Sequence, residues 1–521
     1  MAKISNNTGN GFVYLVGAGP GDPGLITVKG SLALNSCDAV IYDNLVTSEL
    51  IVTLPQHIER HYVGKKSGRQ CCSQDEINDL MIKLAGENKS VVRLKGSDPL
   101  IFGRGGEEAK FLREHNIDFE IIPGVTAGVA VPAYSGIPCT DRHLASFVMF
   151  VTGHKARDKK YSTVPWEWIG KAKGGTIVIY MGVGEIKNIV ETLTKSGMAP
   201  DTPAAIVERG TFPTQKFVTS NLSDLPSAVK EKGIKPPALF IIGEVVTLQP
   251  WLEWFKGKPL IGTRVMVTRA ASPAQKIYEE LREFGAEVLP YPTIEVEEYL
   301  DPKGWNSFDK VKSENRWLIF TSETGVRYFM KQFLEQSGDI RRLGNYKIAA
   351  IGKATAINLQ KFGLSADFIP NKSTAAALGK EMRENVDLKN SEIIRVRGVL
   401  AADSIEKVLS KAGANVIPLT VYNTFYPEWS GGLKEKLFEY PPDVIIFSSG
   451  STVNGLYENL AKKEVESLIK NAEIYSIGPS TSKILEKAGI KVSAEADPHN
   501  MTALINQMVE NISENKDGRS E

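Results

Sequence analysis

The chain has 521 residues, which is too long for one hydrophobic core and suggests about two to four domains. Its 62 basic and 61 acidic side chains nearly cancel, so no overall field favours nucleic acid or an anionic membrane as a partner. No apolar run approaches the roughly 20 residues that span a bilayer, and residues 1–10 lack the apolar core of a signal peptide. The four cysteines and six histidines show no metal-ligand spacing, so we expect a cytoplasmic protein with reduced thiols and no bound metal.

Apolar, strand-like runs alternate with helical patterns almost from end to end, which is typical of α/β domains with mostly parallel sheets. The strands predicted in the first half are Phe12–Gly17, Ala39–Tyr42, Ser90–Lys95, Phe119–Ile122, Ser146–Thr152, Ile177–Met181, Ala204–Val207 and Ala238–Gly243. Trp251–Gly262 then has no regular period, and a new strand is predicted at Arg264–Thr268. We therefore expect a boundary near Gly257, with one domain at residues 1–256 and another at 257–521.

Four segments of the second half recur in order, between 126 and 128 residues apart. The matching pairs are Arg264–Arg269 with Glu392–Arg397, Phe284–Pro290 with Ala412–Pro418, Trp317–Val326 with Val444–Val453, and Ile348–Thr355 with Ile474–Thr481. Four matches at nearly constant spacing indicate an internal repeat. The repeat predicts two similar α/β units, with a ligand-binding cleft between them.

A glycine-rich loop follows the first predicted strand, in the sequence YLVGAGPGDPGL at Tyr14–Leu25. Its spacing differs from the dinucleotide fingerprint, because Asp22 occupies the position of the third glycine. Pro20 and Pro23 lack the N–H donors that would bind a pyrophosphate, so an uncharged adenosine fits the loop better. Taken alone, the loop fits a tight structural turn equally well.

Further motifs accompany this loop: YDNLV at Tyr42–Val46, VGKKSG at Val63–Gly68, VRLKGSDPLIFGRGGEE at Val92–Glu108 and IIPGVTAGVAVP at Ile121–Pro132. Together, over about Gly11 to Leu252, they closely resemble uroporphyrinogen-III C-methyltransferases. The resemblance implies a tetrapyrrole-methylase fold of two α/β lobes that uses S-adenosyl-L-methionine. It also implies methylation of uroporphyrinogen III at C2 and C7, giving precorrin-2 for sirohaem and cobalamin synthesis, by a homodimer formed through this half.

The same resemblance assigns residues to the binding of S-adenosyl-L-methionine, namely Pro20, Gly96, Ser97, Asp98, Ile101, Thr126, Ala127, Met181 and Gly210. Asp98 would accept hydrogen bonds from ribose hydroxyls or from the ligand's amino group, while Met181 and Ile101 would supply apolar walls for adenine. Asp43 matches the family's proposed proton acceptor, and Lys65 matches its proposed proton donor.

Arg104 and Glu107 are candidates to orient the substrate, because uroporphyrinogen carries eight carboxylates and Arg104 suits a bidentate contact. They lie one helical turn apart if GRGGEE opens a helix, and a solvated ion pair is the alternative interpretation. The chain departs from the usual family pattern at Ser97, where a glycine is common. It also departs at Gln70–Ser73, where Cys71 and Cys72 stand in a segment that often carries a histidine.

The chain from Arg264 to about Asn506 resembles uroporphyrinogen-III synthase, through the recurring segments and VYNT at Val421–Thr424. The resemblance implies a pair of flavodoxin-like α/β units that need no cofactor. They would close hydroxymethylbilane to uroporphyrinogen III, with inversion of ring D and loss of water. Tyr422 matches the tyrosine proposed to assist departure of hydroxide, and a half-buried strand tyrosine is the competing interpretation.

Open α/β sheets bind ligands beyond the carboxyl ends of their strands, where helix N-termini, hydroxyls and arginines suit a polycarboxylate. The candidates there are Arg269, Thr321, Ser322, Arg397, Ser448 and Ser449. Capping of the following helices is the competing role of the serines and threonines. Two other functions stay open, namely methylation of a later corrin precursor and a second half that is a non-catalytic, two-lobed binding module.

Overall fold

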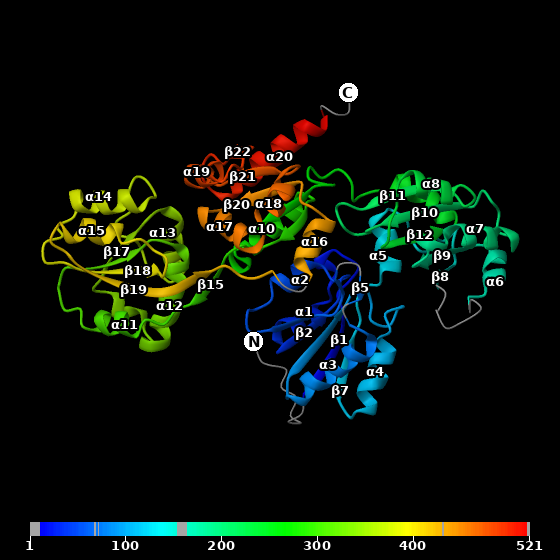
Figure 1. Ribbon diagram of the computed structural model, residues 1–521, viewed down its shortest axis with the longest axis horizontal. Coiled ribbons are helices and arrows are strands. Elements are labelled where there is room, and N and C mark those ends of the chain that lie inside the picture. The colour runs from blue at the N-terminus through cyan, green and yellow to red at the C-terminus, as the bar shows by residue number, and fades with distance from the viewer. Residues whose placement is uncertain (1–10, 67–68, 71, 154–163, 430–431, 518–521) are drawn as a thin grey trace. The chain divides into compact units, whose positions relative to one another are not determined.

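The computed structural model describes residues 11–66, 69–70, 72–153, 164–429 and 432–517 (Figure 1). The chain forms two compact units, Met1–Thr293 with Glu428–Glu521, and Ile294–Pro427. The first unit contains three five-stranded sheets and the second contains one, and in the described chain only β4 and β5 lie outside these four sheets. No helix within the described ranges is long and apolar enough to cross a membrane.

The first sheet has five parallel strands in the order β3-β2-β6-β1-β7. These are β1 (Phe12–Gly17), β2 (Ala39–Tyr42), β3 (Glu59–Tyr62), β6 (Ser90–Lys95) and β7 (Asp118–Ile122). The connecting elements are α1 (Val28–Ser36), α2 (Ser48–Val52), the hairpin of β4 (Lys65–Lys66) with β5 (Arg69–Gln70), α3 (Gln74–Gly86) and α4 (Gly105–Glu114). The three central strands are buried almost throughout, because helices cover both faces of a parallel sheet.

The second sheet is mixed, in the order β11-β10-β12-β9-β8, with only β8 and β9 parallel. Its strands are β8 (Phe147–Thr152), β9 (Gly175–Tyr180), β10 (Pro203–Glu208), β11 (Lys216–Asn221) and β12 (Ala238–Ile242). Its helices are α5 (Ala127–Tyr134), α6 (Trp166–Lys171), α7 (Ile186–Lys195), α8 (Leu225–Glu231) and α9 (Gln249–Leu252). The expectation of mostly parallel sheets is wrong for this lobe, because the short loop between β10 and β11 can join only antiparallel neighbours.

The third sheet completes the first unit and is parallel throughout, in the order β14-β13-β20-β21-β22. Its strands are β13 (Arg264–Val267), β14 (Glu287–Pro290), β20 (Val444–Phe447), β21 (Glu473–Ser476) and β22 (Ala494–Glu495). Its helices are α10 (Ala271–Glu283), α16 (Leu433–Glu439), α17 (Gly450–Asn459), α18 (Lys462–Ile469), α19 (Pro479–Lys487) and α20 (Met501–Asp517).

The fourth sheet forms the second unit, in the order β15-β19-β18-β16-β17, with only the edge strand β15 antiparallel. Its strands are β15 (Glu295–Glu298), β16 (Arg316–Phe320), β17 (Lys347–Ala350), β18 (Glu392–Gly398) and β19 (Asn415–Phe425). Its helices are α11 (Pro302–Asp309), α12 (Glu323–Ser337), α13 (Lys353–Gln360), α14 (Ala375–Asn385) and α15 (Ser404–Ser410).

The two copies of the internal repeat together form the third and fourth sheets, which share one strand order. Replacing each strand of β14-β13-β20-β21 by its repeat partner gives β19-β18-β16-β17, which is the order of the fourth sheet. The third sheet also has the flavodoxin-like order, in which the first strand lies second in the sheet. The prediction of two similar α/β units is therefore confirmed. The units are not consecutive segments, because each takes two of these strands from the first copy of the repeat and two from the second.

Candidate functional site

Strained backbone gathers on three loops of the first half. Of the nine non-glycine residues with positive φ in the described chain, six lie there, namely Ser97, Phe102, Arg104, Met181, Arg209 and Thr211. These loops follow the carboxyl ends of β6, β9 and β10. Each such residue costs about 1–3 kcal/mol, so the concentration marks loops that the surrounding structure holds in a defined shape.

The glycine-rich loop after β1 packs against the loop after β10. The backbone N–H of Asp22 donates to the Thr211 hydroxyl at 3.1 Å. This contact brings Pro20 towards Gly210, although nearly 190 residues separate them in sequence. A Cβ added to Gly210 would lie 2.4 Å from Val131, so only glycine fits at that position. The loops that carry Pro20 and Gly210, two predicted ligand-binding residues, therefore lie against each other.

Hydroxyl groups connect the ends of β6 and β9 with the start of α5. The Ser97 hydroxyl accepts from the N–H of Ala127 at 2.8 Å and lies 3.4 Å from the Thr126 hydroxyl. Thr126 is in turn 2.7 Å from the hydroxyl of Tyr180, whose pKa is raised by burial. Met181 follows directly and exposes about half of its surface. Serine at position 97 thus makes two contacts that a glycine could not make.

Asp98 orders the loop that it belongs to. One carboxylate oxygen accepts from the N–H groups of Leu100 and Ile101, at 2.8 and 3.2 Å. The other accepts from the N–H of Gly124 at 3.0 Å. The carboxylate therefore joins two loops of the site, and Oδ2, which accepts one hydrogen bond, keeps lone-pair capacity for one more donor.

The predicted residues fit an adenosine-bearing ligand. A Cβ on Gly96 would lie 2.6 Å from the side chain of Leu45, so the backbone there is pressed close to its neighbour. Ile101 is half-buried and Met181 is exposed, which leaves apolar surface beside the hydroxyls. None of the nine candidates is a cation, in keeping with an uncharged adenosine rather than a phosphate-bearing ligand.

Asp43 lies at the carboxyl end of β2, in a turn that its own side chain stabilises. Its Oδ1 accepts from the N–H of Leu45 at 3.0 Å, and its carbonyl oxygen accepts from the N–H of Val46 at 3.3 Å. Its Oδ2 lies 3.4 Å from a guanidinium nitrogen of Arg93. The carboxylate is partly exposed and held by a buried cation, which suits a group that exchanges a proton with a ligand.

Lys65 begins the β4–β5 hairpin, close in backbone to the Asp43 turn. A Cβ on the preceding residue, Gly64, would lie 2.7 Å from the backbone nitrogen of Asn44. The Lys65 side chain is not among the parts that the structure describes. Cys71 also lies outside the described residues, and Cys72 is half-buried.

A buried charge cluster that was not predicted from the sequence lies next to Asp43. Glu108 is fully buried, and its carboxylate accepts from Arg93 at 3.3 Å, Lys95 at 2.9 Å and Gln74 at 3.1 Å. Burial lowers the pKa of Lys95, Arg93 acts in the same direction, and Glu108 opposes them. Arg93 thereby joins Glu108 to Asp43. The sequence did contain a sign of this cluster, because Arg93 and Lys95 are two basic residues in the otherwise apolar strand β6.

Arg104 and Glu107 form the solvated ion pair that the sequence left open. Arg104 occupies the position just before α4, and its Nη2 lies 2.6 Å from Glu107 Oε2. The hydrogen bond between them raises the pKa of Arg104 and lowers that of Glu107. Their side chains are 56% and 61% exposed, so the guanidinium stays accessible to a carboxylate ligand.

In the second unit, the hydroxyl of Tyr422 contacts the hydroxyl of Ser322. Their hydroxyl oxygens lie 3.2 Å apart, while Ser322 also accepts from the N–H of Gly325 as the N-cap of α12. Thr321 precedes it at the carboxyl end of β16. Tyr422 is half-buried. Ser322 therefore both caps α12 and lies beside the candidate tyrosine.

Arg397 already forms hydrogen bonds with residues close to it in the sequence. Its guanidinium donates to Glu406 at 3.0 Å, and it also contacts Asp403 and the carbonyl oxygen of Ala401. A substrate carboxylate would compete with these partners for Arg397. The other candidates belong to the first unit, with Arg269 after β13 and Ser448 and Ser449 after β20.

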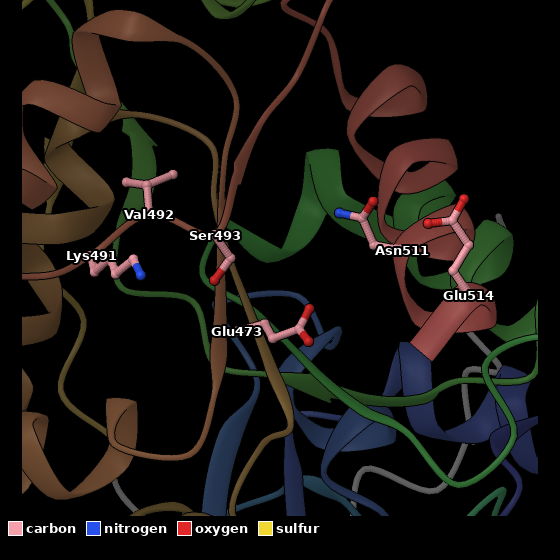
Figure 2. A pocket seen from close by; sticks show the side chains of 6 residues that line it. All are labelled: Glu473, Lys491, Val492, Ser493, Asn511 and Glu514. Carbon is pink, nitrogen blue, oxygen red and sulfur yellow. The ribbon is translucent and has the colours of Figure 1, made fainter. Parts of the chain in front are cut away.

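A pocket of about 420 Å³ is lined by residues of other segments, and Figure 2 shows their side chains. It is lined by Glu473, Lys491, Val492, Ser493, Asn511 and Glu514. The lining includes two carboxylates and one lysine, which is the wrong balance of charge for a polycarboxylate ligand. We therefore assign no part of the site to this pocket.

Comparison with known proteins matches two families along the chain. "Tetrapyrrole (Corrin/Porphyrin) Methylases" matches residues 13–226, and "Uroporphyrinogen-III synthase HemD" matches residues 275–506. Porphyrin biosynthesis protein HemD of Ruminiclostridium josui is 36% identical over 503 residues, which is 96% of this chain and 98% of that protein.

Two further relatives match part of the chain. Uroporphyrinogen-III C-methyltransferase of Bacillus subtilis (strain 168) is 37% identical over 354 residues, covering 68% of this chain and 72% of that protein. The S-adenosyl-L-methionine-dependent uroporphyrinogen III methyltransferase of Methanosarcina barkeri is 46% identical over 238 residues, covering 46% of this chain and 93% of that protein.

Proposed function

This chain belongs to the family of porphyrin-biosynthesis proteins that join a tetrapyrrole methylase to a uroporphyrinogen-III synthase, and we propose that it catalyses both reactions in turn. The second half closes hydroxymethylbilane to uroporphyrinogen III, with inversion of ring D and loss of water. The first half then methylates uroporphyrinogen III at C2 and C7, giving precorrin-2 for sirohaem and cobalamin synthesis. The observation that carries the proposal is that both families match one chain, since the product of one reaction is the substrate of the other.

S-adenosyl-L-methionine, when bound, supplies the methyl group. The residues that would hold it come from the loops after β1, β6, β7, β9 and β10. Gly96 and Gly210 let the backbone approach closely, and Ile101 and Met181 form an apolar wall for the adenine. Asp98 keeps its loop in shape and accepts one hydrogen bond from a ribose hydroxyl or from the ligand's amino group.

Alignment supplies much of the catalysis in methyl transfer to a pyrrole carbon, because the displacement is in line. Arg104 binds a carboxylate of the substrate with the paired geometry of its guanidinium, and Glu107 orients Arg104. Asp43 accepts the proton that the pyrrole releases, with Arg93 holding its carboxylate in place. Lys65 is the proton donor on the neighbouring hairpin.

In the synthase reaction, hydroxide must leave the bilane before the final ring is inverted and closed. The Tyr422 phenol donates a proton or a hydrogen bond to the departing hydroxide, and Ser322 positions the phenol. Strand-end groups bind the carboxylates of the bilane, namely Arg269, Thr321, Arg397, Ser448 and Ser449. We propose no cofactor for this half, since holding the bilane in the inverting geometry is the main requirement.

Three further assignments complete the proposal. Residues 1–256 form the methyltransferase and residues 257–521 the synthase, with the boundary in the irregular stretch around Gly257. Two chains associate through their methyltransferase halves. The protein acts in the cytoplasm.

Separate assays of the purified protein test the two halves. With added uroporphyrinogen III and S-adenosyl-L-methionine, we expect a dimethylated product. With hydroxymethylbilane alone, we expect the type III isomer, because the uncatalysed reaction gives type I. The alternative is a second half that binds without catalysing. Methylation of added substrate with only type I product from bilane would establish that alternative.

A further inference from the structure

Helix α16 belongs to the second half of the chain, yet its Lys436 contacts the Asp43 turn of the first. Lys436 Nζ donates to the carbonyl oxygen of Val46 at 2.8 Å. Burial lowers the pKa of Lys436 to about 8 and Arg209 acts in the same direction, while Asp43 opposes them. The ammonium group therefore lies in the field of the carboxylate that we assign as the proton acceptor.

Two other contacts join the same surfaces. A Cβ on Gly432, just before α16, would lie 2.7 Å from the ring of Tyr62, so the chain there is pressed onto the end of β3. Arg282 of α10 forms an ion pair with the nearly buried Glu49 of α2, the helix that follows the Asp43 turn. The Asp43 turn is thus flanked by contacts from the second half.

A second patch of contacts reaches the loop that carries Gly210. Glu287 of β14 accepts from Arg209 at 2.5 Å and also contacts the hydroxyl of Thr214. The side chains of Arg209 and Glu287 are almost completely buried. The Arg209 guanidinium also lies 3.7 Å from the ring centre of Tyr440, directly after α16. The strained loop after β10 is therefore held by groups of the second half.

Separation of these surfaces would be costly, because it would leave Arg209 without its buried carboxylate partner. These contacts are made with the loops after β2 and β10, to which we assign functional residues. One loop carries Asp43, and the other carries Gly210. A turn that is held on one side by another part of the chain depends on that part for its position.

We propose that the second half is a structural part of the methyltransferase, with Lys436 positioning the Asp43 turn and Glu287 positioning the loop of Gly210. Neither residue touches the reacting atoms, so both are positioning residues. The inference rests on the proposed function for the roles of the two loops. Methyl transfer by this chain is then sensitive to substitutions in its synthase half, which a simple tethering of two enzymes would not produce.

The test uses the full chain and compares Lys436→Met and Glu287→Gln with Lys434→Met. Lys434 lies on the same helix but pairs with Glu464 inside the second half, 2.9 Å away. We expect K436M to lower kcat of methylation about tenfold and E287Q to raise the KM for S-adenosyl-L-methionine about fivefold. We expect K434M to match the wild type, K436R to recover most of the loss, and all variants to keep their synthase rate.

Hydrogen exchange of the Asp43–Val46 and Arg209–Thr214 segments gives a readout that does not need activity. Faster exchange in the segment next to each substitution supports the inference, provided that the melting temperature stays near that of the wild type. Unchanged methylation in both variants overturns it. If the wild-type chain fails to methylate uroporphyrinogen III, the proposed function is wrong. In that case hydrogen exchange alone tests the positioning role, and unchanged exchange in both variants overturns it.

Discussion

The hydroxyl of Tyr422 in β19 lies 3.2 Å from the hydroxyl of Ser322, which follows β16 as the N-cap of α12. The register between β18 and β19 shifts at Arg397 and Gly398, which places Tyr422 opposite Gly398. A Cβ on Gly398 would lie 2.5 Å from the Tyr422 ring, so the glycine makes room for it. Such irregularities often re-aim a side chain next to an active site.

The first prediction concerns this pair. Tyr422→Phe removes the hydroxyl and keeps the ring packing, so we expect the synthase rate to fall about tenfold and the share of type I product to rise. Isomer analysis of the product from hydroxymethylbilane checks this. Tyr426→Phe, a nearby exposed tyrosine, serves as the matched control and should behave as wild type. An unchanged rate in Y422F would remove the role assigned to Tyr422.

The buried cluster around Glu108 gives a prediction about stability. Glu108→Gln leaves Arg93 and Lys95 buried without their carboxylate, which should cost about 3–5 kcal/mol. The neighbouring substitution Glu107→Gln removes an exposed charge and should change stability by about 0.5 kcal/mol or less. Urea denaturation, with hydrogen exchange in β6 as the local readout, measures both. Equal effects of the two substitutions would contradict the importance of the cluster.

Arg104 should affect substrate binding without affecting stability. We expect the KM for uroporphyrinogen III to rise from wild type to Arg104→Lys and further to Arg104→Gln, because lysine keeps the charge but loses the bidentate geometry. The melting temperature should stay nearly constant, since exposed ion pairs contribute only about 0–1 kcal/mol. Steady-state kinetics of methylation checks the order. A KM that does not depend on residue 104 would leave the pair as a surface feature.

Glu49 predicts a pH dependence of stability in the first unit. Burial raises the pKa of Glu49 to about 6 from its ordinary 4.5, with Arg282 opposing the shift. The folded state therefore holds a proton more tightly than the unfolded state, so this contribution to stability is complete below pH 4.5 and is lost as the pH rises through about 6. We expect Glu49→Gln to remove this dependence. Melting temperatures of the wild type and E49Q between these pH values measure it, and parallel curves would contradict the assignment.

Much of the architecture could be predicted from local sequence. The nine strands predicted up to Arg264–Thr268 are present, with ends shifted by at most two residues. The edge strands β3 and β11 were missed because their sequences, ERHY and KFVTSN, are polar and only half-buried. Edge strands need no continuous apolar run, since solvent reaches one side of them.

Features that depend on distant pairing could not be predicted. The repeat indicated two similar units, but nothing local says that each unit combines strands from both copies. The contact of Lys436 with Val46 spans 390 residues, and its strength depends on burial that only the fold creates. Glu108 lies in the recognised GRGGEE motif, yet its importance arises from Arg93 and Lys95 on a neighbouring strand.

The central claim is that one chain carries out two successive reactions, and one measurement tests it most directly. Purified protein is supplied with hydroxymethylbilane and S-adenosyl-L-methionine labelled in the methyl group, and the tetrapyrrole product is analysed by mass and by isomer type. Our account predicts precorrin-2, a type III product with two labelled methyl groups. Unmethylated type III product, or methylated product of type I alone, would contradict it.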